Sequence, residues 1–586
     1  MGNRKPLIIS VCAALVIAAA FAAIFLVFPA KSARKFYLES EGKNFRKYSE
    51  HIKRSYEQFY SSQKPFLSSA SKSRFEISAD VKSDGGKLFG MADASSALDI
   101  LKKCRLIVDS SNDPASGKSL TRMSLLFEKA PLLDASAYMD GKTLGFNVPV
   151  LLPDKYFTAN MDRIDDVYKR FGVPFRPRRV PKLSDAAAAI KFSDRELDSI
   201  AREYGAFISS LISESDVRFG SDAAVNSGGG TLNGREVIVS LDGEKTKRLF
   251  KSIAGKISED DTLIGLTYGN YADIVKILDE AGLFQLFDVL DSQGMLKLSD
   301  SERGFLRSID VKKDLQAFKD SLKTAGSEAS FPGGLKMTLV VDKSQNILDR
   351  KLTFNYMGPD GRKTDVNIHS GTNDVLHDNF DNGFCQISLA GENSAGEKVS
   401  NEFGINTNIK SSAKNGYRNG SIEIKFSSAR NSARDYDLSA RFDIGRNTDE
   451  TTLKTSGTLG YDVRFISGAG GAVNRVAGEI ASVSSKNNKM KTRNTDSTIT
   501  VNAELPLFGT GSVSAEIGLK REDRFDYTFE IPAVRAKDVI DLNSIPDGKL
   551  KTVTDEITAS LAQFYMQNQP LVDALLKGRQ GPNGRQ

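Results

Sequence analysis

The chain has 586 residues, of which 40% are hydrophobic and 26% are charged, a composition typical of a folded protein with room for two or three domains. Its 80 Lys and Arg residues face 74 Asp and Glu residues, so the net charge is only +6 and nucleic acid is not expected as the main partner. The absence of Trp excludes a sugar-binding platform built from Trp rings.

The first predicted element is an uncharged run of 22 residues from Leu7 to Phe28, preceded by Arg4 and Lys5. A helix of this length reaches about 33 Å, enough to cross a bilayer core of roughly 30 Å. The alternative is a cleaved secretory signal, but the positions before the candidate cuts hold the unsuitable residues Phe28 and Lys31. The sequence therefore predicts an uncleaved signal anchor in residues 1–31. It places the protein in the cell membrane as a single-pass protein, with most of the chain extracytoplasmic and the lipid bilayer contacted through residues 7–28.

A membrane-proximal helix is expected next, in residues 32–66. Aromatic and aliphatic residues recur there at spacings of three and four, which is typical of one helical stripe. The stripe consists of Phe45, Tyr48, Ile52, Tyr56 and Phe59. Such a helix either packs on the following domain or lies on anionic lipid.

Residues 67–370 alternate between strand and helix patterns. The segment 75–81 has a polar residue at every second position, and Asp140-Gly141 supplies the tight turn of a predicted hairpin over 138–144. Ser193 and Glu196 form a capping box that opens a predicted helix. We expect an α+β domain here.

Residues 371–546 carry almost only strand signals. Triplets such as Ile422, Ile424 and Phe426 alternate with polar residues, which predicts an antiparallel meander with one apolar face. A helix in 547–577 and a disordered tail in 578–586 complete the chain. The predicted fold class is thus β-rich α+β: an N-terminal transmembrane helix followed by curved antiparallel sheets, half-barrel or sandwich-like, packed with helices.

No motif predicts catalysis. His369 and His377 lie eight residues apart among carboxylates, but this composition is more typical of a polar turn than of a zinc site. Cys104 and Cys385 lie in strand patterns, and they are expected to be buried apolar residues rather than a disulfide pair. We expect no catalytic residue, no cofactor and no metal, and the protein is not expected to be an enzyme.

A proline-rich loop contains three clustered arginines, Arg176, Arg178 and Arg179. Such a cluster either contacts an anionic surface, such as lipid headgroups or wall polymers, or is a solvated connector.

Three segments carry a family resemblance: YMDGKTLGFNV at 138–148, NGREVIVSLDGEKTKRLFKSI at 233–253 and LVVDKSQNILDRKLTFNY at 339–356. Together with the anchor, they resemble uncharacterised signal-anchored envelope proteins of Gram-positive bacteria. The folded part is similar to the half-barrel of lipoprotein carriers, over residues 36–370. The resemblance implies a curved sheet closed by helices around an apolar cavity, and it transfers no site residues.

Two functions are consistent with these patterns. The first is an anchored extracytoplasmic protein that binds a hydrophobic or lipid-like ligand without catalysis. The alternative is a structural or protein-interaction scaffold of the cell envelope without a small ligand. The expected partner besides the bilayer is accordingly a hydrophobic ligand or an envelope protein.

Overall fold

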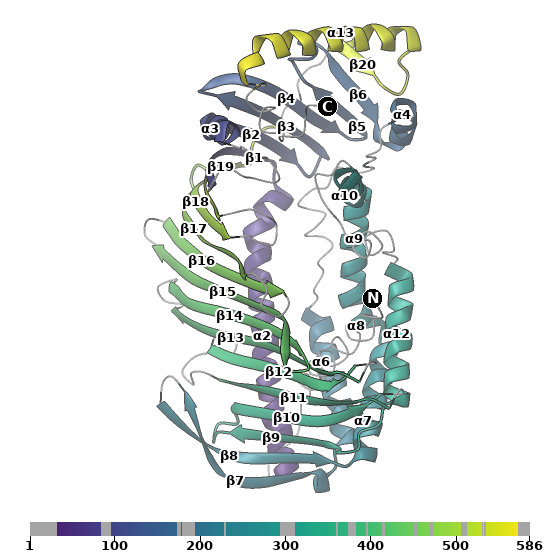
Figure 1. Cartoon of the computed structure of the whole chain (residues 1–586), viewed down its shortest axis with the longest axis vertical. Helices are drawn as coiled ribbons and strands as arrows, with labels where there is room; N and C mark the ends of the chain where they lie inside the picture. Colours follow the sequence, from purple (N-terminus) through teal and green to yellow (C-terminus); the bar gives the residue numbers. More distant parts are fainter. Residues whose placement is uncertain are drawn as a thin grey trace.

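A computed structural model of the chain describes residues 32–83, 95–172, 177, 194–227, 230–292, 311–358, 361–372, 382–393, 396–412, 417–449, 452, 454–467, 473–504, 512–529, 531, 535–571 and 573. The molecule is elongated, and its strands stack along the long axis (Figure 1).

The strands form a single sheet of 20 members. Thirteen strands form an antiparallel meander that begins at the lower end of Figure 1 and ends in its upper third. Each strand pairs with the next one in sequence, and between β8 and β9 the chain passes through helices. They are β7 (Val217–Ser227), β8 (Gly230–Leu241), β9 (Leu335–Val341), β10 (Ile347–Met357), β11 (Lys363–Thr372), β12 (Asn382–Glu392), β13 (Lys398–Ser412), β14 (Tyr417–Arg430), β15 (Ala433–Asp449), β16 (Lys454–Ser467), β17 (Val473–Asn487), β18 (Thr492–Glu504) and β19 (Ser512–Phe525).

The remaining strands extend the same sheet beyond β19. The first strand of the chain pairs antiparallel with β19, and its successors follow in order up to β6, which pairs in parallel with the last strand. They are β1 (Ser71–Ser83), β2 (Cys104–Asp113), β3 (Lys118–Phe127), β4 (Ala130–Asp140), β5 (Thr143–Asn147), β6 (Tyr156–Asn160) and β20 (Val539–Asp541). Among the described strands, β7 and β20 each pair with one neighbour, so the sheet is open at both ends.

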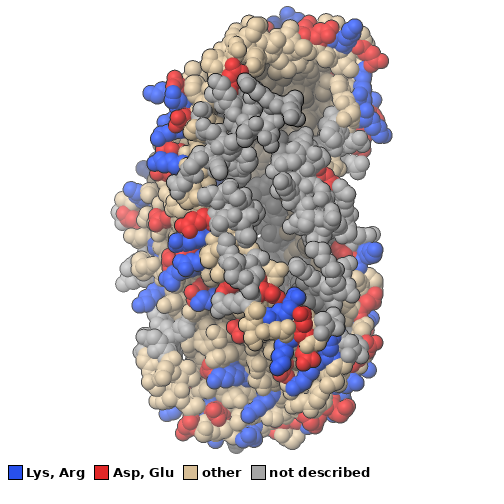
Figure 2. Space-filling view, in the orientation of Figure 1, with Lys and Arg blue, Asp and Glu red and all other residues tan. Residues whose placement is uncertain are grey.

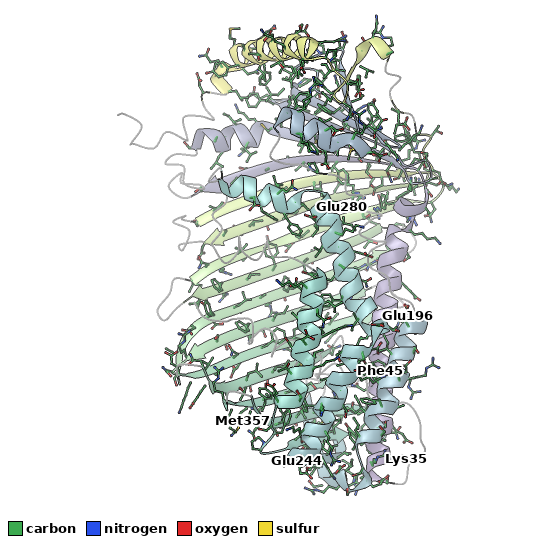
Figure 3. All side chains as sticks on the ribbon, turned by 90° about the vertical axis from the view of Figure 1, so that its right-hand side faces the viewer. Lys35, Phe45, Glu196, Glu244, Glu280 and Met357 are labelled. Carbon is green, nitrogen blue, oxygen red and sulfur yellow. The ribbon has the colours of Figure 1, made fainter. Side chains whose placement is uncertain are left out.

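Helices lie on one face of this sheet. The longest, α2 (Ala33–Ser68), runs along the stack of strands, and several of the others gather opposite the lower half of the sheet (Figures 1 and 3). The others are α3 (Ser95–Lys103), α4 (Ile164–Phe171), α6 (Asp194–Leu211), α7 (Gly243–Glu259), α8 (Asp261–Ile264), α9 (Asn270–Glu280), α10 (Leu283–Ser292), α12 (Val311–Glu328) and α13 (Asp547–Gln567), with a π-helical segment at Gly265–Gly269.

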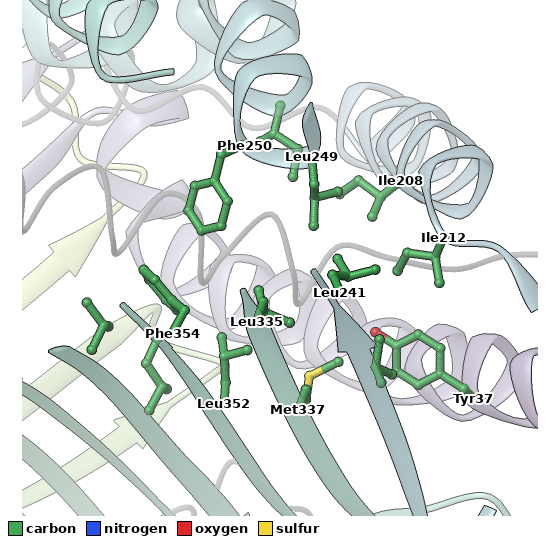
Figure 4. Packing of buried hydrophobic residues seen from close by; sticks show 14 of the residues in the cluster. Tyr37, Ile208, Ile212, Leu241, Leu249, Phe250, Leu335, Met337, Leu352 and Phe354 are labelled. Atoms are coloured by element: carbon green, nitrogen blue, oxygen red, sulfur yellow. The ribbon is translucent and has the colours of Figure 1, made fainter. Parts of the chain in front are cut away.

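The main hydrophobic core lies between the lower strands and these helices. Leu335, Met337 and Leu339 of β9 face Leu249 of α7 and Tyr37 of α2, and all five side chains are buried (Figure 4). Burying each such side chain contributes about 1.5–3 kcal/mol. Alternation along the strands therefore fixes which face of the sheet meets the helices.

A second, smaller core closes the other end of the molecule. Val553 of α13 packs with Phe157 of β6 and Ile540 of β20. Figure 1 shows α13 lying across this end of the sheet.

The predicted fold class is wrong in its account of the sheets. The strands form one sheet of 20 members rather than separate half-barrel-like or sandwich-like sheets, and the ladder between β11 and β12 joins residues on both sides of position 370. In the described part of the chain, no helix is long and apolar enough to cross a membrane. Residues 7–28 lie outside that part.

The predicted helix after residue 32 is present as α2, but its most buried side chains are Tyr37, Ser40 and Glu41. Phe45, the first member of the predicted stripe, is half-buried, and the side chains of the other members lie outside the described residues. The buried stripe of α2 thus begins one turn or more before the aromatic pattern that the sequence emphasises.

Candidate functional site on the inner face of the sheet

One face of the sheet is apolar on strand after strand. We call it the inner face, defined by Leu339, Leu352 and Ile387, which pack against the helices. In each pair of neighbouring strands, an inner-face residue lies directly opposite an inner-face residue of the next strand, so the inner face can be followed from strand to strand. One row crosses six strands: Ile368, Ile387, Phe403, Phe426, Leu438 and Phe465.

A second row continues over the following strands. It consists of Leu459, Ile480, Ile499, Ile517 and Ala79. Beyond it, Ile77, Leu106, Leu125 and Leu133 carry the apolar face from β1 to β4. We call the inner-face apolar residues of β13–β19 and β1–β4 the apolar track.

The cover over the inner face changes along the sheet. From β8 to β12 the apolar side chains belong to the helix-covered core, which ends at Ile387 with Phe403 partly buried beside it. Farther along, Phe426 and Phe465 are each 37% exposed, and Met123 of β3 is 46% exposed. Figure 2 shows this side of the molecule hollowed beneath the end that carries α13. The described part of the track therefore exposes apolar surface that the core strands bury.

The opposite, outer face is charged. On β15 and β16, Arg441 pairs with Asp443 at 3.0 Å and Arg464 pairs with Asp462 at 2.9 Å. Arg475 of β17 donates two further bonds to Asp462, and these bonds, with those of Arg464, hold the pKa of that carboxyl well below its usual range. Such a face suits water.

Helix α2 is fastened to the inner face near both of its ends. At the first end, the buried carboxylate of Glu41 pairs with Arg350 of β10. At the other end, the ring of Phe66 lies 4.9 Å from that of Phe525 on β19. The 25 residues between Glu41 and Phe66 rise about 38 Å, close to the roughly 43 Å of the nine strand steps from β10 to β19. The helix thus runs along the sheet, across its strands.

Burial sets the electrostatics of the first contact. Removing Glu41 from water raises the pKa of its carboxyl to about 7, although the charge and hydrogen bond of Arg350 act in the opposite direction.

The second contact centres on a carboxylate. Asp523 of β19 is completely buried on the inner face and accepts hydrogen bonds from Arg493 at 2.8 and 2.9 Å, from Arg521 at 2.8 Å and from Ser73 at 2.7 Å. Both guanidinium groups lie near the Phe66 ring, 5.2 and 5.1 Å from its centroid. We call Arg493, Arg521 and Asp523 the arginine cluster.

The outer face has a shallow depression of about 300 Å³ over β17–β19, β1 and β2. Glu76 and Arg105 line it and pair with each other at 2.7 Å. Because the described lining brings together no nucleophile, base or metal-ligating set, we assign it no chemistry.

The structure does not test the sites named from sequence. Leu7, Phe28, Arg176, Arg178 and Arg179 lie outside the described residues. His369 bonds to Asp349 at 2.7 Å and lies edge-on against Phe384, whereas its predicted companion His377 is also outside the described residues.

Cys104 and Cys385 are half-buried free thiols, and burial raises the pKa of each. The described residues contain no cluster of three or more His, Cys, Asp or Glu side chains arranged to hold a metal ion.

Sequence reasoning missed the arginine cluster. Its members come from two strands, β18 and β19. The one sequence feature that indicates the cluster is a change in the alternating pattern of β19: Arg521 and Asp523 occupy positions that continue a series of apolar residues. Recognising their role also needs the pairing of β19 with β1, which brings Ser73 to Asp523.

Comparison with known proteins gives little beyond strand arrangement. No protein-family model and no curated protein matches the chain. Solved structures that match include OmpTdeltaL8, a loop L8 deletion mutant of the Vibrio cholerae outer membrane protein OmpT, at 9% identity and a TM-score of 0.18, covering 78% of this chain and 97% of that one. A BenF-like porin from Pseudomonas fluorescens Pf-5 matches at 7% identity and a TM-score of 0.16, covering 78% of this chain and 98% of that one. OccK2 (OpdF) of Pseudomonas aeruginosa matches at 8% identity and a TM-score of 0.15, covering 78% of this chain and 97% of that one. TM-scores this low assign no role to this chain.

These findings correct the predicted identity. The resemblance to signal-anchored Gram-positive envelope proteins with a lipoprotein-carrier-like half-barrel is wrong, because the strands of the described residues form one 20-stranded sheet.

The predicted function and location are corrected with it. Both assumed carrier-like sheets in place of the single sheet found here, and an anchor in residues 7–28, which lie outside the described part of the chain; in that part no helix is long and apolar enough to cross a membrane. We therefore withdraw both the anchored extracytoplasmic ligand-binding protein and the envelope scaffold.

Proposed function

We propose that this protein is a non-enzymatic transport conduit, which moves an apolar molecule from strand to strand along the inner face of its sheet. The observation that carries the proposal is the apolar track, which continues across ladder after ladder from β13 to β4.

The dimensions support movement rather than storage. At about 4.8 Å per strand step, the ten steps from β13 through β19 and β1 to β4 span roughly 50 Å. A drug-sized ligand fits in a pocket of about 300–1,000 Å³ and needs no surface of this length. Successive positions on the track are also chemically alike, so a bound apolar chain gains little by staying at one of them.

The contrast between the two faces supports the same function. Apolar surface that is left exposed on a folded protein marks an interaction site, and on the track it includes Phe426, Phe465 and Met123, on the face opposite the charged pairs. An apolar passenger would bind the inner face and would be rejected by the outer face.

The experiment is a transfer assay with the full chain. Donor vesicles contain a pyrene-labelled phospholipid, acceptor vesicles do not, and the rate of label movement is measured. We expect the protein to accelerate movement, and we expect Val463→Asp in the middle of the track to lower the rate at least ten-fold. The reason is that a carboxylate on an apolar path must be desolvated by any apolar chain that passes it.

The matched control is Arg464→Asp, one residue away on the outer face of the same strand. It should leave the rate unchanged, and thermal unfolding would check that both variants are folded. Equal rates for Val463→Asp and the unaltered protein would contradict passage along the track, as would the absence of any acceleration by the unaltered protein.

A further inference from the structure

The arginine cluster has more positive than negative charge. Arg493 lies opposite Lys486 of β17, so three cationic side chains share this part of the inner face. Asp523 is the one acidic residue at the described inner-face positions of β17, β18, β19 and β1. The formal charges of the three cationic side chains and Asp523 therefore add up to +2.

Asp523 uses only some of the donors around it. A guanidinium group carries five N–H donors. Arg493 donates from Nε and Nη2 to one oxygen of Asp523, and Arg521 donates from Nε to the other oxygen. The two arginine side chains remain 28% and 30% exposed, whereas Asp523 is fully buried. The buried carboxylate thus fixes the two guanidinium groups in place and leaves part of each accessible.

The cluster adjoins the apolar track. Leu519 lies two residues from Arg521 on the same face of β19, and the ring of Phe75 on β1 lies 5.0 Å from the guanidinium of Arg521. Cationic donors beside an apolar surface match a molecule with an anionic end and an apolar chain. Arginine in particular recognises carboxylate and phosphate oxygens through paired donors.

We propose that the arginine cluster binds the anionic phosphate or carboxylate headgroup of the molecule whose apolar part lies on the track. This inference rests on the proposed conduit function and names its substrate class, an anionic amphiphile. A cluster that served only to hold α2 through Phe66 would not distinguish one headgroup from another.

The test compares two labelled lipids with identical chains, phosphatidylglycerol and phosphatidylcholine, in the transfer assay with the full chain. All vesicles hold the same total fraction of anionic lipid, so that recruitment of the protein to the membrane is equal. We expect at least five-fold faster transfer of phosphatidylglycerol. Arg521→Gln and Arg493→Gln should each reduce this preference to two-fold or less.

Arg524→Gln is the matched control, since Arg524 lies on the outer face of β19 and is exposed. It should keep the full preference. Inorganic phosphate added at constant ionic strength separates the two sources of the same chemistry: no competition supports a lipid headgroup, and loss of the preference at millimolar phosphate overturns it in favour of a free anion.

The comparison of the two lipids on the unaltered protein needs no variant, so it holds even if a substitution prevents folding. Equal transfer of both lipids would overturn the headgroup site while leaving the conduit standing. Failure to transfer either lipid would instead overturn the conduit.

Discussion

Glu41 shows how one residue can couple the sheet to the longest helix. Its carboxylate pairs with Arg350, 309 positions later in the chain, in a place that excludes water. Desolvation outweighs the attraction of Arg350 and raises the pKa of Glu41 to about 7 from its ordinary 4.5. In the folded state the group therefore binds a proton at a pH where the unfolded chain has lost it.

The sign of the resulting pH dependence follows from this difference. Between pH 4.5 and about 7 the folded state holds more protons than the unfolded state, so the contribution of Glu41 is fully present below pH 4.5 and is lost as the pH rises through 7. For one group the slope is at most about 1.4 kcal/mol per pH unit. We expect Glu41→Gln to remove this slope, as measured by urea unfolding at several pH values in that window.

Glu50→Gln is the control, because Glu50 is exposed on the same helix and its replacement also removes one negative charge. Its stability profile should stay parallel to that of the unaltered protein. A Glu41→Gln profile that is likewise parallel would show that Glu41 does not titrate in this range.

At the scale of residues, the partner of a buried charged side chain could not be predicted from the sequence. Glu41 sits in a run of charged and polar residues, and neither its burial nor its pairing with Arg350 follows from spacing. The burial and partners of Asp523 likewise do not follow from its sequence neighbours, which are a mixture of charged residues. They follow only from the pairing of β19 with β1 on one side and β18 on the other.

At the scale of elements, the strands of the meander depend on close approach as well as on alternation. Gly478 of β17 lies opposite Tyr461 of β16, whose hydroxyl donates to the backbone oxygen of Thr500 on β18 at 2.9 Å. A Cβ added at Gly478 would lie 1.9 Å from that oxygen and 2.7 Å from the tyrosine hydroxyl. The glycine thus leaves the room in which the Tyr461 side chain bridges two strands.

We expect Gly478→Ala to lower the free energy of unfolding by about 1–3 kcal/mol, since the new methyl group must displace the tyrosine or the neighbouring strand. Denaturant unfolding measures the loss. The reference variant is Gly460→Ala on β16, where an added Cβ would meet Asp443 at an ordinary 3.5 Å. If both alanines had the same effect, crowding at Gly478 would not be the cause.

Individual elements follow from local patterns far better than their assembly does. The alternation of Ile422, Ile424 and Phe426 lies within β14, and Asp140-Gly141 marks the turn between β4 and β5, where Gly141 has a φ of +58°. Periodicity reports which side of a strand is apolar, but it does not say which strand lies beside it. The predicted fold class was wrong because it divided one sheet into several.

At the scale of the molecule, one ladder joins two strands that lie far apart in the sequence, β1 and β19. Ala79 of β1 and Ile517 of β19 are directly opposite although 438 positions separate them. Every other antiparallel ladder joins strands that are consecutive in the chain, including β8 and β9, which are separated only by helices. Pairing between successive strands thus explains most of the sheet, and this seam is the antiparallel pairing that the sequence could least reveal.

The seam can be tested by a cross-link. In a background without the three native cysteines, the pair Ala79→Cys and Ile517→Cys should form a disulfide on oxidation, because directly opposed residues on one face have the required separation. Closing so long a loop should also stabilise the protein by a few kcal/mol. A non-reducing gel and a melting curve measure the two effects.

Shifting one cysteine by a single residue provides the comparison. Glu516 points to the other face, so the pair Ala79→Cys and Glu516→Cys should cross-link poorly. Preferential bonding of this shifted pair would mean that the register between β1 and β19 differs by one residue.

The two free margins of the sheet also have a consequence for self-association. A flat, unprotected border would offer backbone groups to another molecule and allow head-to-tail polymerisation. Here one border is β20, which has only three residues, and the other is β7, whose pairing with β8 is interrupted between Phe219 and Asp222. Neither border presents a long regular template, so the protein can expose a sheet of this size without growing into filaments.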